Sequence, residues 1–188
     1  DITLEETVLD AGNDPLSVAR IGGYFYNTQV TGGATGDIFA GVAIGDRGNG
    51  GLEAYWSVLE SLNDDLDNLV EKGSGTLMAP GTVNFGTPYT VTISYDGDNG
   101  FQFTAGTESE SYSGPARQRA AIAQFKGLGI TVGSEDGGSG TGYAFALFDN
   151  VCIKDATSPD IFYTYDTFDT APLNNDKWRR LETVREIC

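Results

Sequence analysis

Apolar and polar residues alternate along one segment of this chain after another, and this period of two constrains the fold more than any other feature. In residues 19–30, for example, one side would carry Ala19, Ile21 and Phe25. The same alternation occurs in residues 37–46, 51–60, 88–106, 126–134 and 142–155. Because successive side chains of a strand point to opposite faces, each predicted sheet has one apolar face. The sequence therefore predicts an all-β fold, a two-sheet antiparallel jelly-roll sandwich with little helix.

Glycine, asparagine and aspartate separate the predicted strands, and Asp96–Gly100 reads as the turn of a hairpin. Two segments could each hold a turn or a short helix: Ser61–Gly73 and Pro115–Phe125. A chain of 188 residues can bury one sizeable core, and no composition change divides it. We expect one domain with a body of residues 1–165 and a C-terminal strand segment of residues 166–188.

The charge excludes several classes of partner. Eleven basic residues against 27 acidic ones give a formal net charge of −16, so the chain would repel nucleic acids and anionic membrane surfaces. No run approaches the roughly 20 apolar residues that a membrane span needs, so we expect no membrane insertion. The chain has no histidine, which excludes Ser-His-Asp and Cys-His catalysis and the usual catalytic zinc sites.

The cysteine count leaves two alternatives open. Cys152 and Cys188 either form one disulfide or remain thiols. The chain is rich in glycine, threonine, serine and aspartate and poor in lysine and arginine, which is typical of an exported protein. We therefore expect an extracellular or cell-surface location, where a disulfide would persist.

Four stretches together resemble the successive strands of concanavalin A-like and laminin-G-like jelly-roll domains, which are frequent in secreted bacterial proteins and glycan-binding modules. These stretches are "ARIGGYFYN", "TGDIFAGVAIGDRGNGGLEAYWSV", "FKGLGITVG" and "YAFALFDNVCI". The resemblance covers most of Ala19–Ile153, and the closing "FDNV" strand is its most specific part. It implies a concanavalin A-like jelly-roll sandwich.

One element of that family lies in an unusual place in this chain. The family usually opens with an "F-D/S … L-D/N … K-W" element that pairs beside the final "FDNV" strand. Here "TFDTAPLNNDKW" (Thr167–Trp178) is similar to that opening but follows "FDNV". The resemblance implies that Asp166–Cys188 completes a sheet, and its apolar side chains would make the contact: Phe168, Trp178, Leu181, Val184 and Ile187.

Three arrangements of this C-terminal segment stay open. It folds back onto its own sheet as in a circular permutation, the chain is one unit of a tandem array, or the segment completes the sheet of a neighbouring copy. The last arrangement removes an open edge and generates a head-to-tail filament of identical chains.

The resemblance also implies a structural calcium ion and a place for the disulfide. In the family a calcium ion often lies where the opening element meets the last strand, which implicates Asp149 with Asp166 or Asp169. Cys152 and Cys188 lie on segments that would be neighbours, so a bridge would hold the C-terminal strand within the chain or onto the next subunit.

Related jelly rolls include glucanases, which carry paired carboxylates in a pattern similar to E-x-D-x-x-E. Nothing in this chain matches that pattern, because Glu108 and Glu110 alternate correctly but lack the following acids. We therefore expect that the protein is not an enzyme.

A carbohydrate-binding face is the alternative hypothesis. Aromatic rings stack on sugars, while arginine and glutamate bond their hydroxyl groups, and the residues expected on the face away from the core are Arg20, Tyr24, Tyr26, Glu53 and Tyr55. The same residue types also occur on such faces for strand propensity alone.

The sequence thus supports two main hypotheses. In the first, the chain is a non-catalytic extracellular structural subunit of a fibre, surface layer or adhesin, assembling with copies of itself through its C-terminal strand. In the second, it is a monomeric, circularly permuted, lectin-like module that binds glycans. A glycan-active hydrolase or lyase is a weaker third.

Overall fold

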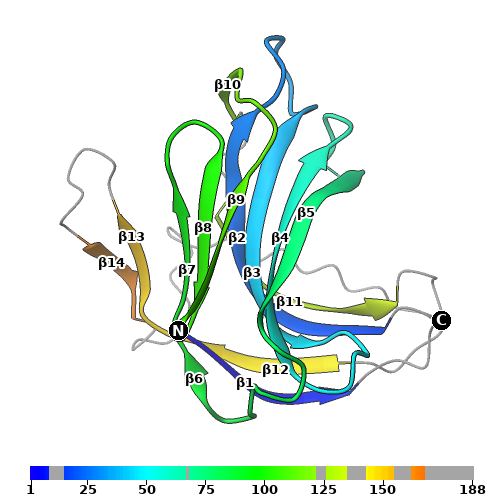
Figure 1. Ribbon diagram of the computed structural model, residues 1–188, viewed down its shortest axis with the longest axis vertical. Helices are drawn as coiled ribbons and strands as arrows, with labels where there is room; N and C mark the ends of the chain where they lie inside the picture. Colours follow the sequence, from blue (N-terminus) through cyan, green and yellow to red (C-terminus); the bar gives the residue numbers. More distant parts are fainter. Residues whose placement is uncertain (9–14, 67, 122–125, 135–142, 155–161, 168–188) are drawn as a thin grey trace.

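The computed structural model of the chain describes residues 1–8, 15–66, 68–121, 126–134, 143–154 and 162–167 (Figure 1). Its described elements are all β-strands, so the all-β prediction is confirmed. The strands form several antiparallel sheets consistent with a β-sandwich, whereas the jelly-roll order stays a prediction. In the described ranges no helix is long and apolar enough to cross a membrane.

The largest sheet has six strands in the order β10-β2-β3-β4-β5, with β11 also pairing with β2. Its members are β2 (Pro15–Asn27), β3 (Asp37–Asp46), β4 (Glu53–Ser61), β5 (Leu69–Met78), β10 (Arg119–Ala120) and β11 (Lys126–Ser134). The segments expected at 37–46 and 51–60 are thus adjacent strands, with Val42 opposite Trp56. Neither segment expected to hold a turn or short helix is helical in its described part.

Two smaller sheets form the second layer (Figure 1). One has the order β7-β8-β9 and faces the upper half of the large sheet: β7 (Val91–Tyr95), β8 (Gly100–Ala105) and β9 (Glu108–Ser113). The other has the order β12-β1-β6 and crosses the lower half: β1 (Ile2–Val8), β6 (Pro88–Tyr89) and β12 (Tyr143–Phe148). The hairpin predicted at Asp96–Gly100 joins β7 to β8, with Tyr95 opposite Phe101.

The strand expected over residues 142–155 is two strands. β12 ends at Phe148, and β13 (Val151–Lys154) begins after Asn150, whose φ of 51° lies in the left-handed region. This bend directs β13 away from the layers, where it pairs with β14 (Phe162–Asp166) (Figure 1). An asparagine tolerates this conformation better than most residues, which explains why the chain turns there.

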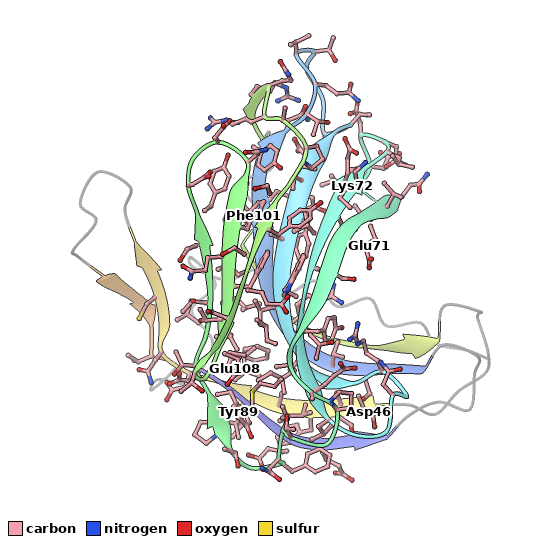
Figure 2. The ribbon with its side chains drawn as sticks, in the orientation of Figure 1. Asp46, Glu71, Lys72, Tyr89, Phe101 and Glu108 are labelled. Atoms are coloured by element: carbon pink, nitrogen blue, oxygen red, sulfur yellow. The ribbon has the colours of Figure 1, made fainter. Side chains whose placement is uncertain are left out.

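Stacked aromatic side chains join the two layers. The rings of Trp56 and Phe103 are nearly parallel, with centroids 4.8 Å apart, and Phe101 stacks on Phe103 at 5.7 Å. Phe101 lies between the β7-β8-β9 sheet and the large sheet (Figure 2). Each of these residues occupies an apolar position of the period-two pattern, so the alternation correctly predicted the core faces of β4 and β8.

The placement of Tyr26 on the outer side of its strand is wrong. A register shift between Tyr24 and Tyr26 marks a β-bulge against β3. Because the bulge adds one residue to β2, the alternation changes phase and Tyr26 turns inward. Its ring is fully buried, stacks on Tyr95 with centroids 5.6 Å apart, and its hydroxyl donates to the carbonyl of Pro115 at 3.0 Å.

Replacing Phe103 tests whether the aromatic stack stabilises the packing of the two layers. We expect Phe103→Ala to lower the free energy of unfolding by about 3–5 kcal/mol, because the change leaves a cavity beside Trp56. Gln102→Ala, the exposed neighbour on β8, should change it by no more than about 0.5 kcal/mol. Urea unfolding followed by circular dichroism measures both, and a loss below about 1 kcal/mol for Phe103→Ala would contradict the assignment.

Candidate functional site

The face of the large sheet that points away from the main core carries the predicted glycan ligands, and we call it the outer face. Val18, Ala43 and Tyr55 form a separate buried cluster there. The strand registers place Arg20 opposite Ala43, and Ala43 opposite Tyr55, in one row across three strands. Tyr24 and Phe39 face each other two rows away. Arg20, Tyr24 and Tyr55 thus share a face, as predicted.

Two of the predicted glycan ligands already have partners within the chain. Arg47 donates two hydrogen bonds to the Glu53 carboxylate, both at 2.8 Å, and Asn49 donates a third at 3.0 Å. The Arg47 guanidinium also lies 3.9 Å from the centre of the Tyr55 ring. Because Glu53 is 1 % exposed and Tyr55 is 5 % exposed, neither presents a free surface to a sugar.

The Arg47–Glu53 pair also determines the charge state of Glu53. Burial acts to raise the pKa of Glu53, but hydrogen bonds from Arg47 and Asn49 and the Arg47 charge outweigh it, so the pKa lies below its ordinary value. The hydrogen bond to Glu53 correspondingly raises the pKa of Arg47. Both side chains stay charged at neutral pH, and the pair neutralises a carboxylate that would otherwise be buried alone.

Arg20, Tyr24 and Phe39 form the partly exposed remainder of the outer face. The Tyr24 and Phe39 rings meet edge to face with centroids 5.4 Å apart. The Phe39 ring covers Gly22, where a Cβ atom would lie only 2.4 Å from Phe39 Cζ. Arg20 Nε is shielded from solvent and has no hydrogen-bond partner in the described part of the chain.

Phe39 was not among the predicted ligands. Its position in the alternation, opposite to Ile38, was visible in the sequence, but its pairing with Tyr24 depends on the register between β2 and β3.

The two long sides of the sandwich differ. On the side of β5 and β9, two side-chain hydrogen bonds cross between the layers: Trp56 Nε1 on β4 donates to the Glu110 carboxylate at 2.6 Å, and the Tyr112 hydroxyl donates to the carbonyl of Lys72 on β5 at 2.6 Å. Figure 2 shows Lys72 on β5 at this margin of the large sheet. These contacts tie β9 to β4 and β5, although β9 pairs with neither strand.

On the opposite side, β11 approaches β12 without pairing with it, and we call this gap the β11–β12 seam. β12 pairs with β1 on its other side, from Ile2 opposite Phe148 to Val8 opposite Tyr143. Within the described strands, the seam edge of β12 has no hydrogen-bonded neighbour. Unpaired backbone groups on such an edge can accept a further strand.

β12 is apolar on both of its faces. Ala146 points into the main core, whereas Phe145 and Leu147 point outward and are 54 % and 52 % exposed. Large apolar side chains side by side on the solvent face of an edge strand are typical of an interaction surface. Both faces of this strand are apolar in the sequence, so the alternation does not distinguish which of them is covered.

The predicted calcium and disulfide residues fall partly outside the described ranges. Asp149 is exposed, and its carbonyl accepts a hydrogen bond from the amino terminus at 2.6 Å. Backbone pairing places Asp166 opposite Val151, near Asp149 in the chain, but the side chain of Asp166 and all of Asp169 lie outside the description. Across the described ranges no three His, Cys, Asp or Glu side chains form a metal-binding group.

Cys152 is exposed on β13, and Cys188 lies outside the described residues, so the disulfide stays a prediction. The same holds for the predicted assembly residues Phe168, Trp178, Leu181, Val184 and Ile187.

In the described ranges, the carboxylates whose pKa departs from its ordinary value shift in one direction. Hydrolysis of a glycosidic bond needs a general acid whose pKa is raised. Hydrogen bonds instead lower the pKa of four described carboxylates: Glu53, Glu60, Asp64 and Asp96. Glu110, one of the two alternating acids of β9, accepts the indole hydrogen of Trp56.

A scan of protein-family models, a search of curated proteins and a search of solved structures each found no match to this chain. The resemblance to concanavalin A-like domains therefore stays a proposal.

Removing Arg47 tests the pair that occupies the outer face. We expect Arg47→Gln to lower the free energy of unfolding by about 3 kcal/mol at pH 7, because Glu53 would be a buried charge without a cation. The folded-state pKa of Glu53 lies below 4.5, so its stabilising contribution is complete above that value and is lost as pH falls through the folded pKa. The cost of the substitution should therefore shrink in acid.

Urea unfolding at pH 7 and pH 4 measures this effect. Lys72→Gln is the matched control, because it removes a more exposed ion pair with Glu60 and should cost at most about 1 kcal/mol. An Arg47→Gln loss that is no greater than the control, or that grows in acid, would refute the role given to Arg47.

Proposed function

We propose that this protein is a non-catalytic extracellular structural subunit that assembles head to tail by β-strand complementation. In this arrangement the C-terminal segment 166–188 of one copy pairs with the seam edge of β12 in the next copy. The single observation that carries the proposal is the combination, on β12, of an unpaired edge and two exposed large apolar side chains, Phe145 and Leu147. Main-chain hydrogen bonds would supply affinity, and these side chains would supply a specific contact.

The chemistry of the C-terminal segment suits that edge. It carries apolar residues that could cover Phe145 and Leu147, among them Phe168, Trp178, Leu181, Val184 and Ile187. A segment that joins a neighbour's sheet also removes the exposed apolar surface of β12 from water, which stabilises the assembly. The contact is heterologous, and a heterologous contact that does not close into a ring continues into a filament.

The high net negative charge supports the proposal of an extracellular subunit that contacts neither nucleic acids nor anionic membranes. A charge of −16 on 188 residues keeps subunits soluble until a specific contact forms. Because like-charged copies repel each other at low salt, we expect assembly to strengthen as ionic strength rises.

A lectin-like module is the second candidate, and one observation favours it. Arg20, Tyr24 and Phe39 leave a partly exposed aromatic and cationic group on the outer face. The contacts of Arg47 with Tyr55 and Glu53 count against the lectin-like module, because they make two of the five predicted ligands inaccessible to a sugar.

Solution mass tests the assembly proposal on the full chain. Light scattering should give a mass above 20.0 kDa that rises with concentration, and the double substitution Phe145→Lys, Leu147→Lys should return the chain to a monomer. Phe85→Lys is the matched control, since Phe85 is similarly exposed but lies outside β12. A sharp monomer peak for the wild type at high concentration would contradict the proposal. Unchanged assembly of the Phe145→Lys, Leu147→Lys variant would contradict it as well.

Binding to a glycan array tests the second candidate, the lectin-like module. If the outer face binds sugars, Tyr24→Ala should reduce binding at least tenfold through loss of ring stacking, while Tyr89→Ala, distant on β6, should bind as the wild type does. Absence of binding by the wild type, or equal binding by both variants, would remove the lectin hypothesis.

A further inference from the structure

Buried polar side chains gather at the end of the large sheet where β2 ends, β3 begins and β4 ends. Asn27 is the last residue of β2, Asp37 is the first of β3, and Ser61 is the last of β4. Each is at most 1 % exposed. Ile38 pairs with Glu60, so Asp37 and Ser61 each lie one position beyond that pair, at the same end of neighbouring strands. Burial of three polar side chains together requires hydrogen bonds or another compensating group.

One carboxylate oxygen in this group lacks such compensation. Asn27 Nδ2 donates to Asp37 Oδ1 at 2.8 Å and to the carbonyl of Thr35 at 2.9 Å. The main-chain N–H of Asp37 donates to the carbonyl of Ala34 at 2.8 Å. Asp37 Oδ2 is shielded from solvent and has no hydrogen-bond partner among the described residues. Asp37 itself is 0 % exposed.

The nearby cationic side chains are engaged elsewhere. Arg119 donates to the carbonyls of Thr31 and Gly33 in the β2–β3 loop, and Lys72 pairs with Glu60 at 2.8 Å. Neither is an ion-pair partner of Asp37. Leaving a buried carboxylate oxygen without a hydrogen-bond donor or a cation is costly. Because no described residue compensates Oδ2, a bound group is the candidate partner for it.

We propose that Asp37 is the anionic ligand of a calcium site at this end of the large sheet. Neutral oxygens at the same end of the sheet come from the Thr35 carbonyl, which accepts from the Asn27 amide as Asp37 does, and from the Ser61 hydroxyl on the adjacent strand. The Ser61 hydroxyl donates to the carbonyl of Asn63 at 2.7 Å, which leaves its oxygen lone pairs for a cation. Bound water would complete the coordination shell. An all-oxygen donor set in a chain without histidine suits a hard cation rather than zinc or copper.

The single carboxylate also predicts how tightly the ion binds. Calcium affinity rises with the number of charged ligands, so a site with one carboxylate belongs with weak sites whose dissociation constants are on the order of 0.1–1 mM. The ion would tie the β2–β3 loop to the end of β4. This site is separate from the one implied at Asp149, Asp166 and Asp169, of which Asp166 is the last residue of β14 and Asp149 lies two residues before β13.

The full-length chain, freed of metal with EDTA and then titrated with CaCl2, tests the site. We expect the thermal midpoint to rise by about 3–5 °C at 10 mM calcium, and calorimetric titration to include a component in the millimolar range. Asp37→Asn removes the charged ligand and should abolish that component and the thermal shift. In the absence of calcium this variant should be at least as stable as the wild type, because it no longer buries an uncompensated charge.

Two matched variants separate this site from other acids. Asp64→Asn changes an exposed carboxylate in the same loop region, whose Oδ1 is already bonded by the main-chain N–H and hydroxyl of Thr35, and should leave calcium binding unchanged. Asp149→Asn changes the other predicted calcium residue and should also leave the Asp37 component unchanged. Direct titration of the wild type keeps the test valid if Asp37→Asn fails to fold. A wild type that binds no calcium at 10 mM, or a component that survives in Asp37→Asn, would overturn the proposal.

Discussion

The stack of aromatic rings between the layers is the interaction on which the rest of the structure depends. Trp56 and Phe103 meet nearly face to face, and Phe101 extends the contact toward Tyr26 and Tyr95. The second layer consists of two three-stranded sheets, and small sheets of this kind are stable only when a hydrophobic face is covered. The β7-β8-β9 sheet meets the large sheet through these rings, whereas the β12-β1-β6 sheet adds Ile2, Leu4 and Ala146 to the same core cluster.

The scarcity of cations shapes the polar chemistry. With 11 basic residues for 27 acidic ones, most carboxylates have no cationic partner, and solvent must stabilise them. The cations near buried acids are directed to particular partners, Arg47 to Glu53 and Lys72 to Glu60. Asp37 is buried as completely as Glu53, and within the described ranges its carboxylate accepts a side-chain hydrogen bond from the amide of Asn27 alone. This contrast between the two buried acids is the basis of the calcium site that we propose at Asp37.

The two sides of the sandwich illustrate a similar contrast. Edge strands are a liability, because their unpaired groups accept other strands. The β5–β9 side is closed by Glu110 and Tyr112, whose side chains bond across it. The β12 edge instead carries exposed Phe145 and Leu147. A chain that protects one side and leaves apolar residues on the other is organised for contact at the second side, which is the physical basis of the proposed assembly.

The sequence alone determined that the chain is all β, which side chains of β4 and β8 face the core, and that Arg20, Tyr24 and Tyr55 share a face. Period-two alternation contains this information, because the side-chain direction of a strand depends only on local backbone geometry. Only the tertiary structure decided that a bulge turns Tyr26 inward, that Arg47 covers Tyr55, and that the chain bends at Asn150 and directs β13 away from the layers. It also decided that Asp37 is buried, with no hydrogen-bond partner for its Oδ2 atom among the described residues. These features depend on register and on contacts between residues distant in the chain, and a local pattern does not encode which strand lies beside another.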